Sequence, residues 1–468
     1  MKLSFLRAAT VALLLGAGLL TSACEKQLEI EPEQSIDAAT ALTDAQAVES
    51  AVVGAYSRLY DPGLYGTNLL LVPELLANAG YINWQGTFQS YREIQLKQPI
   101  PQINVEAERT WRQAYRLINI TNLIVDALPV VRDADQRNQY EGEARLLRGL
   151  MYFELVRLYG QNDAASPLGV PIVLSGNTTV AESSQRVARS TVQQVYTQIL
   201  ADMEAAEAKL PESNETGRFD LYDAKALLAR VHLQRGNYAQ ARDLADEVIE
   251  NSGAALNGSV LDAFTSRGTA EVLFEVVQND QNNAGASNDG LATFFSSNAE
   301  GFGGRGDVEV IQAFANQYDA TDERGLAGQA GIGTSGLYIG DGRRVGGIHT
   351  YKWNEPGQNI PLIRLAEMLL IRAETNLRLG TSVGATPLAD VNAIRQRAGA
   401  TPRPAVTLPL VLLERELELA FEGFRLHDYR RTGRALGTFA ANDPKLVLPV
   451  PRYEINLGNA LPQNPGYN

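Results

Sequence analysis

The feature that most constrains the fold is a helical hairpin in the middle of the chain, LYDAKALLARVHLQRGNYAQARDLADEVIEN at residues 221–251. Apolar residues recur at helical spacing up to residue 235, and Gly236 then breaks the first helix. Tyr238 and Ala241 open a second helix in the pattern GNYAQA, which is typical of tetratricopeptide repeats. The glycine allows a tight turn and the alanine lets the two helices approach. The stretch therefore predicts a helix pair that must stack on others to bury its apolar faces.

Weaker copies of this pair occur along the rest of the chain. The predicted pairs lie near 44–128, 143–210, 221–251 and 360–399, with one helix beginning at residue 360. Four pairs are enough to bury a continuous core, because repeat arrays need about three. We therefore predict a mainly α fold of tetratricopeptide-like helix pairs, with long insertions lying as loops on one face.

The remaining segments differ in character from the helix pairs. Residues 252–357 are rich in Gly, Asn and Ser, which predicts a loop-rich insertion. Within it, 271–277 predicts a short strand and 308–318 a short helix. A closing helix and a proline-rich tail are expected over 408–468, with the tail extended over the surface. These segments and the helix pairs together form one predicted domain, 41–468.

The amino terminus is typical of an exported lipoprotein. Residues 1–23 combine two basic residues, an apolar run too short to span a bilayer, and small residues before Cys24. Cys24 is the only cysteine, which excludes an internal disulfide and places the thiol where a bacterial lipobox needs it. We expect cleavage before Cys24, attachment of a lipid such as palmitate to its sulfur, and a tether over 24–40. The alternative is an ordinary signal peptide that leaves a free thiol.

Charge and motifs argue against several classes of function. The formal net charge is −13, and an acidic surface repels phosphate backbones, so nucleic acid is not an expected partner. GFGGRG at 301–306 matches a dinucleotide motif but lacks the preceding strand and following helix that this motif needs. The histidines, His232, His349 and His427, are far apart and not at metal-ligand spacing. We expect no catalytic residues, no metal and no cofactor.

The densest polar stretch, EGFRLHDYRRTG at 422–433, raises the question of an active site. Three glutamates recur at four-residue spacing before it or at its start: Glu414, Glu418 and Glu422. This spacing predicts a polar flank on one helix. We expect Arg425, Arg430 and Arg431 to pair with Glu418, Glu422, Asp428 and helix carboxyl ends. The stretch is therefore predicted to lock the last helix to the array.

Several segments, in this order, resemble the SusD/RagB family of outer-membrane nutrient-binding lipoproteins. They are LLRGLMYFELVRLYG (146–160), NIPLIRLAEMLLIRAETNLRLG (359–380), LADVNAIRQRAGA (388–400), ERELELAFEGFRLHDYRRTG (414–433), LVLPVPRYEINLGN (446–459) and QNPGY (463–467). The resemblance implies a right-handed superhelical body of tetratricopeptide-like pairs with a loop-rich subdomain. It also implies a lipid anchor in the outer membrane, facing the cell exterior. The implied partner is a TonB-dependent transporter resembling SusC, on which the protein acts as a lid that captures an oligosaccharide or, in some relatives, a peptide.

A loop with the composition of a sugar-binding surface lies at 78–93. Aromatic rings stack on the apolar faces of sugars, while amide side chains bond the hydroxyls. The candidate ligand-binding residues are Trp84, Tyr81, Phe88, Asn78 and Asn83. The alternative is that these rings pack the loop onto the body. A second candidate region surrounds Phe294, Phe295 and Phe302, with Asn282, Asn283 and Asn288. Trp111 and Trp353 are predicted to be core residues.

Three functions compete on these observations. The first is a surface glycan-binding subunit of an importer, which the aromatic and amide composition of the 78–93 loop favours. The second is a tetratricopeptide-like lipoprotein that binds a peptide or protein. The third is a lipid-anchored hydrolase, which the sequence disfavours because it shows neither a nucleophile nor a metal constellation.

Overall fold

The computed structural model describes residues 41–162, 165–178, 187–285, 288–300, 302–326, 335–456 and 461–467. The chain divides into two units, 1–42 and 43–468, and the second holds nearly all of the described residues. Cys24, the predicted signal peptide and the predicted tether lie outside the described residues. Among the residues that are described, no helix combines the length and hydropathy needed to span a bilayer.

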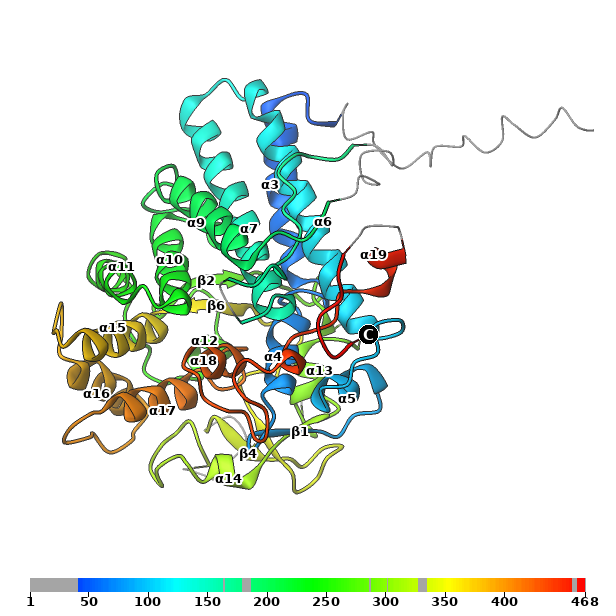
Figure 1. The fold of residues 1–468 in the computed structure, drawn as a ribbon. Helices are drawn as coiled ribbons and strands as arrows, with labels where there is room; N and C mark the ends of the chain where they lie inside the picture. Colours follow the sequence, from blue (N-terminus) through cyan, green and yellow to red (C-terminus); the bar gives the residue numbers. More distant parts are fainter. Residues whose placement is uncertain are drawn as a thin grey trace, which may run out of the picture. The chain divides into compact units, whose positions relative to one another are not determined.

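Paired helices form most of the body (Figure 1). The helices of the four predicted pairs are α3 (Ala45–Ser57) with α6 (Val105–Ala127), α7 (Ala134–Tyr159) with α9 (Val192–Glu207), α10 (Leu221–Arg235) with α11 (Tyr238–Asn251), and α15 (Leu365–Leu379) with α16 (Pro387–Arg397). The two members of each pair contact one another. Contacts of α6 with α7, α9 with α10, and α11 with α15 join the pairs into one stack. The predicted mainly α fold of helix pairs is confirmed.

Local sequence explains the hairpin of α10 and α11. The side chain of Asp220 caps α10 by accepting hydrogen bonds from the backbone N–H groups of Tyr222 and Asp223. Gly236 ends the helix in the left-handed conformation at φ 75°, which costs a glycine little. Ala241 and Ala245 of α11 are fully buried, so these small side chains let the two helices approach.

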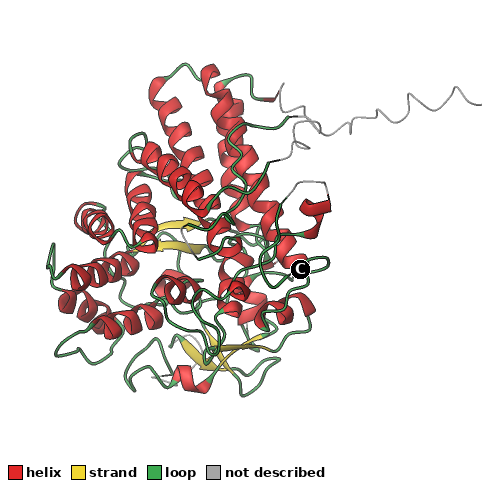
Figure 2. Ribbon diagram, in the orientation of Figure 1, coloured by secondary structure: helices red, strands yellow, loops and turns green. Residues whose placement is uncertain are grey.

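The strands gather in two small antiparallel sheets (Figure 2). One sheet has the order β1 (Ile82–Trp84), β3 (Val308–Val310), β5 (Ile348–Thr350) and β4 (Leu337–Ile339). The other pairs β2 (Val272–Val276) with β6 (Ile360–Arg364). Short helices surround them: α4 (Asn68–Leu76), α5 (Gln89–Gln95), α12 (Asp262–Thr265), α13 (Leu291–Phe295) and α14 (Gln312–Ala315). Among the described residues, three 3₁₀ helices complete the connections: η1 (Arg58–Tyr60), η2 (Leu128–Val130) and η4 (Pro444–Leu446).

Two predicted helix boundaries in this part of the chain are wrong. The helix expected to begin at 360 is preceded by β6, whose five residues are all buried and pair with β2. The helix expected over 308–318 is strand β3 followed by the single turn α14. Both segments are apolar and short, and such runs suit a buried strand as well as a helix until a pairing partner decides between them.

The carboxyl-terminal segment contains α17 (Leu408–Glu418), α18 (Arg425–Arg431) and α19 (Arg452–Asn456). The tail was expected to extend over the surface, but its residues from Leu446 to Leu448 are fully buried. The Leu448 N–H donates to the Leu158 carbonyl at 2.7 Å, near the end of α7. The Asn464 amide donates to the Tyr159 carbonyl at 2.9 Å. The tail is therefore part of the core. Its apolar residues are buried, and it bonds to the carboxyl end of α7.

Candidate functional site

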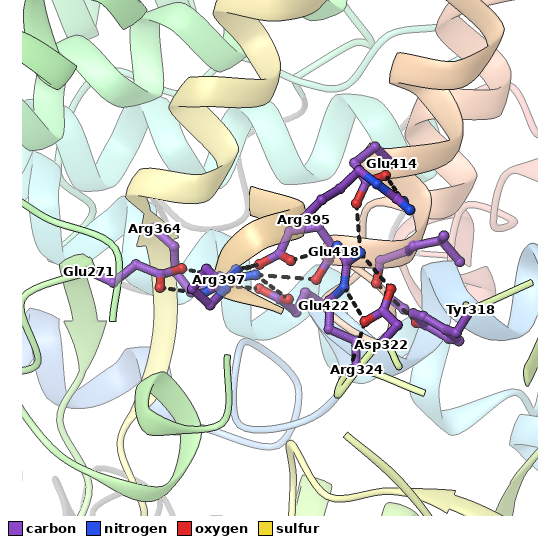
Figure 3. A network of polar contacts seen from close by, with 12 residues as sticks. Glu271, Tyr318, Asp322, Arg324, Arg364, Arg395, Arg397, Glu414, Glu418 and Glu422 are labelled. Carbon is purple, nitrogen blue, oxygen red and sulfur yellow. Dashed lines mark hydrogen bonds and ion pairs between the residues drawn. The ribbon is translucent and has the colours of Figure 1, made fainter. Parts of the chain in front are cut away.

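The polar stretch around α17 is a buried ion-pair network (Figure 3). Glu418 accepts hydrogen bonds from Arg364 Nη1 at 3.0 Å, Arg324 Nη1 at 3.1 Å and Arg397 Nη2 at 2.5 Å. The carboxylate is fully buried, and burial alone raises its pKa. The guanidiniums, led by Arg397, outweigh burial and hold the pKa of Glu418 well below its usual range. Glu418 is therefore held ionised.

Each arginine of this network meets more than one carboxylate. Arg364 also pairs with Glu271 at 2.5 Å and Glu422 at 2.7 Å. Arg324 also pairs with Asp322 at 2.8 Å and Glu414 at 2.6 Å. Of the predicted polar flank, Glu414 and Glu418 lie on α17 and face other elements of the protein, whereas Glu422 lies in the turn after this helix. Apart from Asp322, each carboxylate is engaged by buried guanidiniums that come from other elements, so the network is structural.

The arginines of α18 fix this helix to its neighbours through Asp428 and helix carboxyl ends, as predicted, and also through Glu374 and Glu416. Arg431 pairs with Asp428 at 2.7 Å and with Glu374 at 2.7 Å. Arg430 donates to the Arg157 and Gly160 carbonyls at the carboxyl end of α7. Arg425 pairs with Glu416 and reaches the carbonyl groups of Ala77 and Ala79. The expected pairing of these arginines with Glu418 and Glu422 is wrong, because Arg364 and its neighbours occupy both carboxylates.

His427 is unsuited to acid–base chemistry. The side chain is buried, and neither ring nitrogen has a hydrogen-bond partner. Burial and the nearby cations Arg157, Arg430 and Arg230 hold its pKa well below the usual value, so the ring stays neutral. In the part of the chain that the structure describes, no group of acidic, histidine or cysteine side chains is arranged to hold a metal ion.

Tyr81, a predicted ligand-binding residue, lies in the core. Its ring stacks on Phe421 with centroids 5.2 Å apart, and the Arg425 guanidinium lies 4.6 Å from its centroid. Its hydroxyl oxygen accepts the Phe421 N–H at 2.6 Å. The ring has no solvent-exposed face on which a sugar can stack.

Trp84 is also a core residue, with 2% of its surface exposed. Its ring contacts Tyr91 at 4.9 Å and Phe294 at 5.4 Å between centroids. Phe294 and Phe295 are fully buried as well. The sequence suggested two separate ligand surfaces at 78–93 and near 294, and the structure instead packs their rings on each other. As predicted, Trp111 and Trp353 are buried too.

The two predicted asparagines help to hold the 78–93 loop. Asn78 Oδ1 accepts a hydrogen bond from the Lys97 ammonium, and Asn83 Oδ1 accepts one from Gln95 Nε2 at 3.0 Å. Both side chains are half-buried. The amides therefore orient the loop through contacts with the last residue of α5 and with Lys97, which follows this helix.

Phe88 remains exposed among the predicted aromatic residues of the loop. It has 38% of its surface exposed, and Phe302, from the second candidate region, has 41%. The Arg305 guanidinium lies 4.9 Å from the Phe88 ring centroid and donates to Thr87 Oγ1 at 3.0 Å. Arg305 also pairs with Asp307 at 2.9 Å, which fixes the guanidinium beside the ring. These contacts join the 78–93 loop to the loop before β3.

Further polar groups join the end of β1 to β3 and to the segment between β4 and β5. Gln85 Nε2 donates to Glu309 at 2.9 Å, and Arg344 Nη2 donates to the Gln85 carbonyl at 2.6 Å. We call Gln85, Phe88, Phe302, Arg305, Glu309 and Arg344 the Phe88 surface. Gly86 permits the close approach, since a Cβ there would lie 2.5 Å from the Trp84 ring and 2.7 Å from an Asp307 oxygen.

The Phe88 surface combines an exposed aromatic ring with several hydrogen-bonding groups. An aromatic face accepts the apolar face of a sugar, and guanidinium, amide and carboxylate groups bond hydroxyls. Sequence analysis missed Arg305, Glu309 and Arg344 as members of this surface. Arg305 lies 218 positions from Thr87 in the chain, so only the antiparallel pairing of β1 with β3 brings the two loops together.

Comparison with known proteins agrees with this architecture. Residues 28–233 match a family model described as starch-binding associating with outer membrane, and residues 334–447 match the SusD family model. SusD-like protein P2 of Formosa agariphila is 24% identical, and the alignment covers 90% of this chain and 92% of the relative.

Solved structures share the fold across nearly the whole chain. A SusD superfamily protein from Bacteroides thetaiotaomicron has 25% identity and a TM-score of 0.76, covering 90% of this chain and 100% of that one. A laminarin-binding SusD-like protein has 24% identity and a TM-score of 0.73, covering 91% and 100%. The two family models match successive parts of this chain, and the solved structures share its fold. Together these findings show that this chain belongs to the SusD/RagB family.

Proposed function

We propose that the protein is a cell-surface lipoprotein that binds an oligosaccharide at the Phe88 surface. The observation that carries the proposal is the exposed Phe88 ring, held between loops and flanked by Arg305 and other hydrogen-bonding groups. This combination suits a ligand with apolar faces and many hydroxyls. The match to a starch-binding family model and the likeness to a laminarin-binding protein support a glycan as that ligand.

Calorimetry with linear oligosaccharides of starch and laminarin, and with peptides of similar length, tests this proposal. We expect saturable binding of at least one oligosaccharide and no binding of peptides. Phe88→Ala should weaken sugar binding about two- to tenfold, since an aromatic contact contributes about 0.5–1.5 kcal/mol.

Tyr238→Ala is a matched control because Tyr238 also lies beside a guanidinium, that of Arg378 at 4.7 Å, but on helix α11. This variant should bind the sugar like the original chain. Binding of peptides alone would favour the peptide-binding alternative. Sugar binding that survives Phe88→Ala unchanged would place the glycan elsewhere.

The proposal includes lipid attachment to Cys24 and delivery of the ligand to a transporter. The lone cysteine after an apolar export signal supports the anchor, and the family resemblance supports a TonB-dependent partner similar to SusC, on which this protein acts as a lid. Cells fed a labelled fatty acid should label the original chain and not Cys24→Ser. Purification from solubilised outer membranes should recover a large β-barrel protein with the original chain, and its absence would contradict the lid role.

A further inference from the structure

A second pocket lies away from the Phe88 surface, where α7, α9, α10 and α18 meet. Its volume is about 210 Å³. Half of its polar lining residues are arginines, and the lining includes Arg157, Arg235, Arg430, Arg431, Tyr196 and Gln161. None of the described residues that line it is acidic. In a chain with a net charge of −13, a pocket with this lining is an exception that requires explanation.

Two of the four guanidiniums at this pocket are neutralised by neighbouring carboxylates. Arg431 pairs with Glu374 and Asp428, and Arg157 pairs with Glu154. These two arginines therefore add little net charge to the pocket. The positive character of the pocket must come from the other two guanidiniums.

Arg235 and Arg430 supply that charge. Neither pairs with a carboxylate among the described residues: Arg235 donates to Gln193 and lies 4.6 Å from the centroid of Tyr196, while Arg430 donates to two backbone carbonyls. Arg430 is 5% exposed, and burial lowers its pKa to about 10. A buried guanidinium without a carboxylate is costly, so this arrangement favours an external anion.

The pocket also has surplus hydrogen-bond donors. Buried side-chain N–H groups without an acceptor include Arg430 Nε, Arg157 Nε and Gln161 Nε2. An unpaired buried donor costs about 1–3 kcal/mol, and native proteins contain few of them. Three such donors on residues that line one pocket favour a ligand whose oxygen atoms can accept their hydrogen bonds.

We infer that this pocket binds a small oxyanion, such as sulfate or the carboxylate or sulfate ester of an acidic sugar. Guanidinium groups match the oxygen geometry of these anions and bind them by charge-assisted hydrogen bonds. Arg235 and Arg430 supply the charge, and the amide of Gln161 supplies a neutral donor. The inference does not depend on glycan binding at the Phe88 surface, because the two sites share no residue.

Calorimetry on the full chain at constant ionic strength tests the inference, with sodium sulfate, sodium glucuronate and glucose as ligands and chloride as the background anion. We expect saturable binding of sulfate or glucuronate and none of glucose. Preference for glucuronate assigns the site to an acidic sugar, and preference for sulfate assigns it to the free ion. Absence of saturable binding by both anions overturns the inference.

Arg235→Gln is the decisive variant, because Arg235 is half-buried and makes no ion pair with the described residues. Its affinity for the preferred anion should fall at least about tenfold. Arg112→Gln removes the same charge from α6, where Arg112 is half-exposed and pairs with Glu108, and should leave the affinity unchanged. Equal affinities in the original chain and Arg235→Gln would overturn the inference.

A further variant tests whether the chain supplies the anion itself. Asp163 follows Asn162, a residue that lines the pocket, and lies outside the described residues. Asp163→Asn should bind the anion as the original chain does. Anion binding that occurs only in Asp163→Asn would mean that the chain's own carboxylate is the occupant, and would overturn the inference of an external ligand.

Discussion

Two groups of arginines in this protein, all of them buried except the half-buried Arg235, have opposite surroundings. In the ion-pair network around α17, Arg324 and Arg364 each pair with several carboxylates. In the pocket between α7, α9, α10 and α18, Arg430 meets backbone carbonyls only, and Arg235 meets a glutamine and a tyrosine ring. The difference shows that the partners of a buried arginine, and not its burial, separate a structural ion pair from a candidate binding group.

The largest expected effect comes from removing an arginine of the network around α17, where carboxylates compensate the buried positive charges. Arg364→Gln leaves Glu271, Glu418 and Glu422 without their shared cation, and we expect a loss of about 3–5 kcal/mol in the free energy of unfolding. The same change at Arg430 removes only hydrogen bonds to carbonyls and should cost about 1–2 kcal/mol. Urea denaturation of both variants measures the two losses, and equal losses would contradict the distinction.

The second largest effect is a loss of stability in acid, where carboxylates that pair with buried arginines become protonated. The pKa values of Glu418, Glu374 and Asp428 are all lowered in the folded protein by arginines that outweigh burial. Their contribution to stability is present above the unfolded-state values of about 4 and is lost as the pH falls further. The free energy of unfolding should therefore fall steeply below about pH 4.5. Glu418→Gln should show a shallower fall, and parallel curves would argue against Glu418 as a contributor.

Glu74 extends the comparison to an uncompensated carboxyl group. It is fully buried, makes no ion pair with the described residues, and burial raises its pKa to about 8, although the Gly423 N–H donates to it at 2.7 Å. The folded state therefore keeps a proton that the unfolded state loses, and stability should decline between about pH 4 and pH 8.

Glu74→Gln should remove this decline and exceed the original chain by about 1–3 kcal/mol at pH 8, with little difference at pH 4. Thermal unfolding across this range measures it. Glu212→Gln, at an exposed position, should follow the original curve. A Glu74→Gln variant that is less stable at pH 8 would show that the carboxylate is ionised and paired.

The smallest expected effect is at the pocket itself. Without added oxyanion, Arg235→Gln should change the free energy of unfolding by less than about 0.5 kcal/mol, because its charge pairs with no carboxylate in the described part of the chain. Chemical denaturation in a chloride buffer measures this change. A loss comparable to that of Arg364→Gln would mean that Arg235 belongs to a structural network.

The sequence predicted the helical part of the molecule well because its cues are local. The cap at Asp220, the left-handed turn at Gly236 and the buried Ala241 follow from neighbouring residues. The strand β6 was missed because its pairing with β2 depends on a segment about 90 positions away. The buried tail was missed because proline-rich sequence suggests exposure, whereas Leu446 and Leu448 are fully buried and Leu448 bonds to Leu158 near the end of α7.

The candidate site was less predictable than the fold. Composition indicated an aromatic loop at 78–93, but it did not reveal which rings face inward. Tyr81 and Trp84 pack against residues from distant parts of the chain, and only Phe88 of the three rings stays exposed. The cation beside Phe88 is Arg305, from a loop more than 200 positions away in the chain. No local pattern in the sequence indicates this contact.

The burial of the carboxyl-terminal tail bears on how the protein is made. Residues 446–450 and Asn464 supply hydrogen bonds and buried apolar side chains at the end of α7, which lies in the first half of the chain. A ribosome synthesises these residues after all of the helix pairs, so a nascent chain that already contains every helix pair still lacks the cover for one of them. Protein lacking its last few dozen residues should therefore be a target for proteases even though all of its helix pairs are present.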